Sequence, residues 1–315
     1  MIATAFREGP LAATLRSLAA QSRVPEEIVV VDGDPQPGIE RVVKEAAHHH
    51  GLNIIYSRLE PPSAAVQRNV GTKASSGEVI LFLDDDAYPE PDCLEKMMQV
   101  LEEDAQLRVG GVGVLIRNQL CLPPRWKAKR WLDFLADEIR PSYSGMVVGP
   151  AINIGPEPTA DGRVVPVEWL NCGCTAYRRA ALPDGGFNSR FTGYSYMEDV
   201  DLSVRVARRW KLVVHTGACI YHDTQPSRFK RPYTRARMGV QNRYYVMTAT
   251  LGRTSLRHHL KFLATVGMGL LFGLRGMRRP GDFADWLLAL CGTIRGLGGV
   301  SGFLATRGWR RHNQV

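Results

Sequence analysis

Hydrophobic and polar positions along the first hundred residues follow two periods in turn. Short continuous apolar runs, typical of buried strands, alternate with stretches in which apolar residues recur every three or four positions, as on one face of a helix. The pattern predicts strands at 26–34, 52–58 and 78–86 and helices at 9–22, 39–51, 63–75 and 91–104, the last with Pro91 in its first turn. This alternation indicates an α/β domain with a mostly parallel sheet and helices on both faces.

The second half of the chain is less regular. Residues 117–170 are rich in Pro, Trp and Gly. Beyond them, the pattern predicts a strand leading into a helix over 164–182 and a Gly/Tyr loop that enters a helix near Glu198. Two short strands are expected within 211–223.

Charge divides the chain into two parts. Residues 226–315 hold sixteen Lys or Arg and two acidic residues, a balance of +14, so the first 225 residues carry −5 of the total of +9. We therefore expect an α/β domain over 1–225 and a basic, amphipathic helical region over 226–315. A basic region of this kind favours an anionic surface as its partner.

Acidic side chains gather where the predicted strands end. Asp32 and Asp34 follow one strand, and Asp84, Asp85 and Asp86 follow another. In sheets of this class, ligands bind beyond the carboxyl ends of the strands. Three adjacent carboxylates repel one another, so either solvent or a metal ion must offset their charge.

Five segments in this order resemble the family-2 glycosyltransferases of GT-A fold, in particular the bacterial polysaccharide and rhamnosyl-type transferases. The resemblance covers about residues 1–225 and rests on the following stretches: "IVVVDGDP", "AAVQRNVGTKASSGE" with "ILFLDDDAYPEPD", "NCGCTAYRRAALPDGGFNSRF", "MEDVDLSVRVARR" and "IYHD". It implies a nucleotide half at about 1–116 and an acceptor half at about 117–225. It also implies a nucleotide-sugar donor and a divalent cation, Mn²⁺ or Mg²⁺, that neutralises the diphosphate leaving group.

The resemblance also implies roles for individual residues. Asp86, Asp84 and His222 are expected to hold the metal, with Asp84 and Asp85 also facing the donor nucleotide. For each acid of the triplet the alternative is a solvated turn, and for His222 it is a structural histidine.

Other positions of the resemblance point to the nucleotide and to the base. Asp32 would accept the imide N–H of uracil or thymine, which favours a UDP- or dTDP-sugar, and Arg68 would face the phosphates. Asp199 is expected to be the catalytic base of an inverting transfer, supported by Glu198. The alternatives are a loop acid for Asp32, a surface Arg68 and a helix cap for Asp199. Asp201 is expected to be structural.

Other functions remain open at this stage. A sugar-1-phosphate nucleotidyltransferase shares much of the α/β plan but needs a Gly-rich, basic signature near the N-terminus, which "MIATAFREGPLAATLRS" matches poorly. A non-catalytic sugar-nucleotide or membrane-binding relative is the other alternative. The Q-x-x-R-W signature of processive synthases is absent, and "QNRYY" at 241–245 departs from it. This absence favours single sugar additions.

The ends of the chain and its cysteines suggest a location. Family members usually carry apolar residues before "IAT", so either the start site is annotated late or the first strand is short. No signal peptide is recognisable, and six cysteines in a chain of this length favour a reducing cytoplasm. The apolar runs 262–274 and 284–305 lie between basic residues, and they predict two helices in the membrane interface or a soluble helical hairpin.

We therefore expect a protein that is peripheral to the inner face of the plasma membrane and acts on a glycan or polyprenol-linked acceptor. The apolar content of the basic region argues against nucleic acid as its partner.

Overall fold

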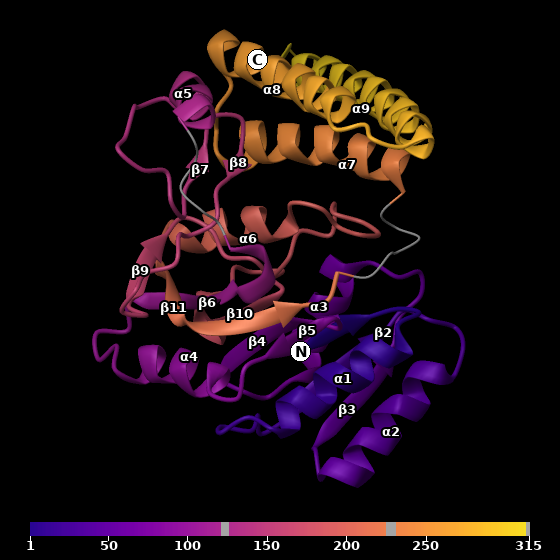
Figure 1. The fold of residues 1–315 in the computed structure, drawn as a ribbon, viewed down its shortest axis with the longest axis vertical. Coiled ribbons are helices and arrows are strands. Elements are labelled where there is room, and N and C mark those ends of the chain that lie inside the picture. Colours follow the sequence, from indigo (N-terminus) through magenta and orange to yellow (C-terminus); the bar gives the residue numbers. More distant parts are fainter. Residues whose placement is uncertain (121–125, 225–230, 313–315) are drawn as a thin grey trace. The chain divides into compact units, whose positions relative to one another are not determined.

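The computed structural model describes residues 1–120, 126–224 and 231–312, which divide into two compact units. The first unit is built from the described parts of 1–129, 140–147 and 153–225, and the second from 130–139, 148–152 and 226–315. The domain boundary predicted at 225/226 falls outside the described residues. Figure 1 shows the α/β arrangement of the first unit and the long helices of the second.

A mostly parallel sheet forms the centre of the first unit. Its first half consists of β3 (Ile54–Arg58), β2 (Ile28–Asp32), β1 (Ile2–Thr4) and β4 (Val79–Asp84), in that spatial order and all parallel. Nearly every position of β2 is apolar and buried, as expected for a parallel strand covered on both faces. The predicted strands are therefore confirmed, with slightly shorter bounds.

The second half of the sheet mixes directions. β10 (Cys174–Arg178) runs antiparallel between β4 and β6 (Val109–Ile116), and β11 (Lys211–His222) runs parallel to β6. β5 (Ala87–Pro89) and β9 (Val164–Val167) pair antiparallel with β11, and β7 (Val147–Val148) pairs with β8 (Ile152–Asn153) in a separate small sheet.

Helices surround this sheet, and most begin and end near the predicted positions. They are α1 (Glu8–Ala19), α2 (Gly38–His50), α3 (Ala64–Ala74), α4 (Cys93–Glu102) and α6 (Glu198–Ala207), with 3-10 turns η1 (Arg117–Gln119) and η2 (Arg179–Ala181). A further helix, α5 (Trp126–Leu135), lies mostly in the second unit. Gly51 ends α2 in the left-handed conformation that glycine tolerates.

Three local predictions were wrong. Pro91 precedes α4 instead of lying in its first turn, because its carbonyl accepts a hydrogen bond from the Ser22 amide. The stretch 164–182 forms two strands and a 3-10 turn instead of a strand and a helix, since β10 is paired on both sides. The stretch 211–223 forms one strand instead of two, because pairing with β6 resumes at Cys219 after a register shift that follows His215.

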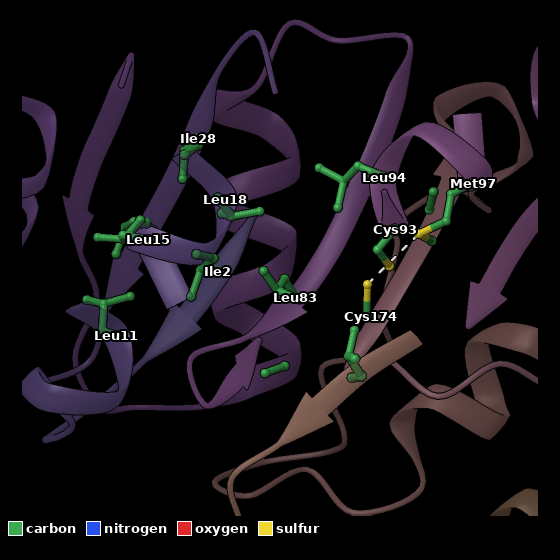
Figure 2. Packing of buried hydrophobic residues seen from close by; sticks show 14 of the residues in the cluster. Ile2, Leu11, Leu15, Leu18, Ile28, Leu83, Cys93, Leu94, Met97 and Cys174 are labelled. Carbon is green, nitrogen blue, oxygen red and sulfur yellow. Dashed lines mark hydrogen bonds between the residues drawn. The ribbon is translucent and has the colours of Figure 1, made fainter. Parts of the chain in front are cut away.

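Packing of α1 and α4 on the sheet makes the core of this unit. The side chains shown in Figure 2 include Leu11, Leu15 and Leu18 of α1, packed beside Ile2 and Ile28 of the sheet. Each such side chain contributes about 1.5–3 kcal/mol when fully buried. The core thus fixes the strands whose ends carry the acidic residues.

A cavity of about 740 Å³ opens at the amino end of β1. It is lined by the first residues of β2 and β4, including Ile28, Val79 and Leu81, while the α-amino group of Met1 donates a hydrogen bond to the Leu81 carbonyl. The cavity therefore lies at the edge of the sheet opposite the acidic residues.

The second unit is helical. It contains α7 (Pro232–Tyr245), a π-helical turn (Val246–Thr250), α8 (Leu256–Arg275) and α9 (Pro280–His312). The two helices predicted from the apolar runs correspond to α8 and α9 but are longer, and α7 was not anticipated. Within the described residues, one helical stretch, Gly281–Val300, is long and apolar enough to cross a membrane by length and composition, a property that core helices of soluble proteins share.

Candidate active site

The register of the parallel strands brings polar residues to one edge of the sheet. Thr4 lies opposite Asp32, and Ala3 lies opposite Asp84, so the last residues of β1, β2 and β4 are neighbours. The acidic turn continues from there into β5. This edge is where ligands bind in open α/β sheets.

Asp84, Asp86 and His222 form a cluster with the composition of a metal site, which we call the cation cluster. One ligand atom from each lies within 4.8 Å of the others, and His222 Nε2 is 3.0 Å from Asp86 Oδ1 and 3.9 Å from Asp84 Oδ2. Pairing of β5 with β11 creates the cluster, because His222 lies opposite Ala87 and the Asp223 amide donates to the Asp86 carbonyl. Two carboxylates and one imidazole fit a divalent cation of the Mn²⁺ type.

Asp86 is held in its ionised form. Burial opposes ionisation, but the His222 imidazole and the Arg7 guanidinium outweigh it and keep the pKa of this carboxyl below its usual range. Arg7 Nη1 is 2.7 Å from Asp86 Oδ2. A carboxylate that is ionised at neutral pH is ready to bind a cation.

Asp85 lies outside this cluster. Its Oδ2 accepts a hydrogen bond of 2.7 Å from the Thr4 hydroxyl, and its Oδ1 is 2.6 Å from Arg7 Nη1. Burial raises the pKa of Asp85 to about 6, although Arg7 opposes the shift. Asp85 thus anchors the loop after β1, and its predicted contact with the donor remains a prediction. Arg7 and Thr4 were not predicted, because their only signal in the sequence is their position at the end of the first strand and just after it.

Arg68 forms ion pairs with one residue of the cation cluster and one residue of α6. This buried side chain extends from α3 and forms ion pairs of 2.6 Å with Glu198 and 2.9 Å with Asp84. Its guanidinium also lies over the ring of Phe187, 5.3 Å from the centroid. Burial disfavours its charge, but its surroundings, the carboxylates among them, raise the pKa of Arg68 above its usual value. Arg68 therefore links the cation cluster to α6.

The residues before α6 have a strained backbone. Ser195 and Met197 have φ angles of 56° and 77°, in the left-handed region that residues other than glycine seldom adopt. The Ser195 hydroxyl accepts a hydrogen bond from the Ala65 amide and donates to the Phe191 carbonyl, which holds this turn against α3. Strain of this kind is common at functional sites, and here the hydrogen bonds of Ser195 hold the strained turn that leads into α6.

Asp199 has the properties of a general base. Burial raises the pKa of its carboxyl to about 6, while the Val200 amide and Arg68 oppose the shift and Asp84 adds to it. Its Oδ1 accepts a hydrogen bond of 2.8 Å from the Val200 amide. Burial also raises the pKa of Glu198, against the effect of Arg68. Asp199 is therefore ionised at neutral pH, yet it is more basic than an exposed aspartate.

Asp32 is buried at the end of β2 and forms hydrogen bonds to Asp34 and Tyr56. Its side chain is 0% exposed. Its Oδ1 accepts from the Asp34 amide at 2.7 Å, and its Oδ2 accepts from the Tyr56 hydroxyl at 2.8 Å. Burial raises the pKa of Asp32. Its contact with a base remains a prediction, since both oxygens are already occupied by the chain's own groups.

Gln67 is a further residue that the sequence analysis did not identify. Its buried amide donates to the carbonyls of Thr4 and Val31 at 2.9 and 2.8 Å, and it accepts from the Ser63 amide. It thereby joins the ends of β1 and β2. Asp201, expected to be structural, pairs with Arg205 at 2.9 Å within α6.

Comparison with known proteins identifies relatives of this arrangement. Residues 1–158 match the family model for glycosyl transferase family 2. An uncharacterized glycosyltransferase of Haemophilus influenzae is 35% identical over 101 residues, and the succinoglycan biosynthesis protein ExoM of Rhizobium meliloti is 29% identical over 125 residues. The matches cover 32% and 38% of this chain, and only 33% and 40% of the relatives.

Solved structures show the same fold. S. aureus TarS 1-349 in complex with UDP-GlcNAc superposes with a TM-score of 0.52 at 19% identity, covering 94% of this chain and 80% of that one. The mannosyltransferase PcManGT from Pyrobaculum calidifontis, in complex with GDP-Man and Mn²⁺, superposes with a TM-score of 0.54 at 15% identity, covering 94% and 85%. The GT-A fold predicted from the sequence is thereby confirmed.

Proposed function

Since this chain belongs to glycosyl transferase family 2, we propose that it is a metal-dependent, inverting glycosyltransferase that adds single sugars to a glycan or lipid-linked acceptor. Membership of the family makes it an enzyme that transfers sugar from a nucleotide-sugar donor. The observation that carries the proposal is that Arg68 joins the cluster of Asp84, Asp86 and His222 to Glu198, the neighbour of Asp199 in the first turn of α6.

The proposed reaction gives one task to the cation cluster and a second task to Asp199. A divalent cation held by Asp84, Asp86 and His222 would neutralise negative charge on the diphosphate leaving group. Asp199 accepts the proton of the acceptor hydroxyl while that oxygen forms a bond to the anomeric carbon. The bond from this carbon to the diphosphate oxygen breaks, and the nucleoside diphosphate leaves with the electron pair. Attack opposite the leaving group inverts the anomeric carbon.

Arg68 supports both tasks without reacting. Its ion pair with Asp84 fixes one end of the cation cluster, and its ion pair with Glu198 fixes the first turn of α6 beside Asp199. A rigid link of this kind holds the base and the leaving-group site at a constant separation. Its predicted contact with the donor phosphates remains part of the proposal.

A UDP- or dTDP-sugar is the favoured donor, on the strength of the carboxylate of Asp32 at the end of β2. The two structural neighbours do not choose among nucleotides, because one binds UDP-GlcNAc and the other GDP-Man. The Tyr56 hydroxyl competes with the imide N–H of uracil or thymine for Oδ2 of Asp32. Tyr56→Phe should therefore strengthen binding of a uracil or thymine nucleotide, and unchanged binding would count against Asp32.

The test is a screen of nucleotide release. Purified protein is stripped of metal and incubated with UDP-, dTDP- and GDP-sugars, with and without Mn²⁺ or Mg²⁺. We expect release from one donor class, dependent on the cation and reduced in Asp86→Asn. Asp201→Asn is the matched control, because this acid also lies in the first turn of α6 and forms an ion pair with Arg205 of the same helix. Release that is indifferent to chelation would refute metal dependence.

We further propose that the second unit binds the inner surface of the plasma membrane. Exposed leucines recur along α8 at helical spacing, and apolar residues do the same on α9; they are Leu256, Leu260, Leu263, Leu271, Leu274, Phe283, Leu287 and Ile294. Basic residues adjoin these stripes, among them Arg275, Arg278 and Arg279. Apolar faces bordered by arginine are typical of helices that lie in the headgroup region.

Vesicle sedimentation tests this surface. Leu260→Glu should reduce binding to vesicles containing anionic lipid, because it places a charge on a face that is to enter the membrane interface. Leu107→Glu in the first unit is the matched control, since Leu107 is 60% exposed and Leu260 is 58% exposed. Equal binding of both variants would contradict the membrane proposal.

A further inference from the structure

His222 lies where β11 loses one of its neighbours. Strand β6 accompanies β11 up to the pair Ile220 with Ile116, while β5 continues on the other side to His222. From Ile116 the chain turns into η1. The backbone of His222 therefore has a strand partner on one side and needs other partners on the β6 side.

Asn118 of η1 supplies these partners with its side chain. Its Nδ2 donates to the His222 carbonyl at 2.9 Å, and its Oδ1 accepts from the His222 amide at 3.1 Å. One side-chain amide thus makes the two hydrogen bonds that a neighbouring strand would have made. The same two-bond arrangement recurs between Asn69 and the backbone of Phe187, both at 2.7 Å, where it ties α3 to the loop before α6.

The turn that carries Asn118 is anchored on both sides. Arg117 forms a two-pronged ion pair with Glu90, with Nε–Oε1 and Nη2–Oε2 distances of 2.8 and 2.7 Å. Gln119 donates to the Thr224 hydroxyl at 2.9 Å. Because two planar hydrogen bonds define an orientation as well as a distance, the Arg117–Glu90 pair holds the turn at a fixed position beside β11.

We propose that Asn118 is a positioning residue for the cation site, an inference that rests on the proposed role of His222 as a metal ligand. It fixes the backbone of His222 so that the imidazole Nε2 stays beside Asp86 and Asp84. Residues that orient metal ligands typically change metal affinity by about 10–100-fold when they are replaced. An imidazole also matters more to Mn²⁺ than to Mg²⁺, which prefers oxygen ligands.

The experiment titrates metal into the full chain without nucleotide. Mn²⁺ binding is followed by electron paramagnetic resonance, Mg²⁺ by competition, and nitrogen coupling to bound Mn²⁺ by electron–nuclear double resonance. The variants are Asn118→Ala, Asn118→Asp, which keeps only the acceptor, and His222→Ala. Asn53→Ala is the matched control, because it also removes an asparagine side chain that donates to a backbone carbonyl, that of Glu26, before β3 at the other end of the sheet.

We expect Asn118→Ala to weaken Mn²⁺ binding about 10-fold, to weaken Mg²⁺ binding less, and to reduce the nitrogen coupling. Asn118→Asp should fall between it and the wild type, Asn53→Ala should match the wild type, and His222→Ala should abolish the coupling. Wild-type Mn²⁺ affinity in Asn118→Ala, together with a loss in His222→Ala, would overturn the role of Asn118 alone. Unchanged binding in His222→Ala would overturn the proposed cation site and this inference with it.

Discussion

Replacing Asp199 by Asn separates catalysis from folding. The amide keeps the size of the carboxylate and an oxygen that accepts the hydrogen bond from Val200. It removes the negative charge and the ability to accept a proton. Since general base catalysis contributes about 10²–10⁴-fold to rate, we expect kcat to fall by that factor. Affinity for the donor should change little, because Asp199 acts on the acceptor.

The same substitution should stabilise the protein at neutral pH. Burial raises the pKa of Asp199 from 3.8 to about 6, so keeping it ionised in the folded state costs at most about 3 kcal/mol. The folded state binds the proton more tightly than the unfolded state, so this cost is absent below about pH 4 and is complete above about pH 6. The neutral amide of the Asp199→Asn variant would carry no such cost. The stabilisation should therefore appear at pH 7.5 and vanish toward pH 4.

Two assays check these outcomes. Turnover is measured with the donor identified by the release screen, and the free energy of unfolding is measured by denaturant titration at pH 7.5 and pH 4. Asp201→Asn serves as control for any change of charge on α6. Full turnover in Asp199→Asn would show that another group is the base, and a variant less stable than the wild type at pH 7.5 would refute the assigned burial cost.

Two other predictions concern Asp199 and Arg68. The logarithm of kcat should rise with unit slope up to about pH 6 and level off above it, because Asp199 must lose its proton to act and burial raises its pKa to about 6. Stopped assays between pH 5 and pH 8 measure this profile, and a kcat that is constant across this range would contradict the prediction. Arg68→Met should destabilise the folded state by about 3–5 kcal/mol, because it leaves Asp84 and Glu198 without their buried partner; a denaturant midpoint close to that of the wild type would argue against the ion-pair link.

Much of the fold was predictable because its signals are local. The apolar run of β2 and the helical spacing of α1 depend on near neighbours in the chain, and both elements formed as expected. The wrong predictions arose where tertiary contacts decide. Two short strands were expected within 211–223, but pairing with β6 resumes at Cys219 after a register shift and one strand results.

The site was predictable in composition but less so in geometry. The resemblance pointed to Asp84, Asp86 and His222, which the fold brings within 4.8 Å. It did not reveal that the middle acid of the triplet turns toward Thr4 and Arg7, since that depends on the loop after β1. Arg7 and Asn118 lie outside the segments that carry the resemblance, and Gln67 lies inside one of them without an assigned role. Only the packing of distant strands shows what they hold in place.

The central claim is that one site built by Asp84, Asp86 and His222 holds the cation of a sugar-transfer reaction. Its most direct test is a crystal structure of the protein with Mn²⁺ and the nucleoside diphosphate of its donor, with data collected at the manganese absorption edge. We expect an anomalous peak bound by these three residues and in contact with the diphosphate. A diphosphate bound without metal at this edge of the sheet, or a peak elsewhere, would contradict it.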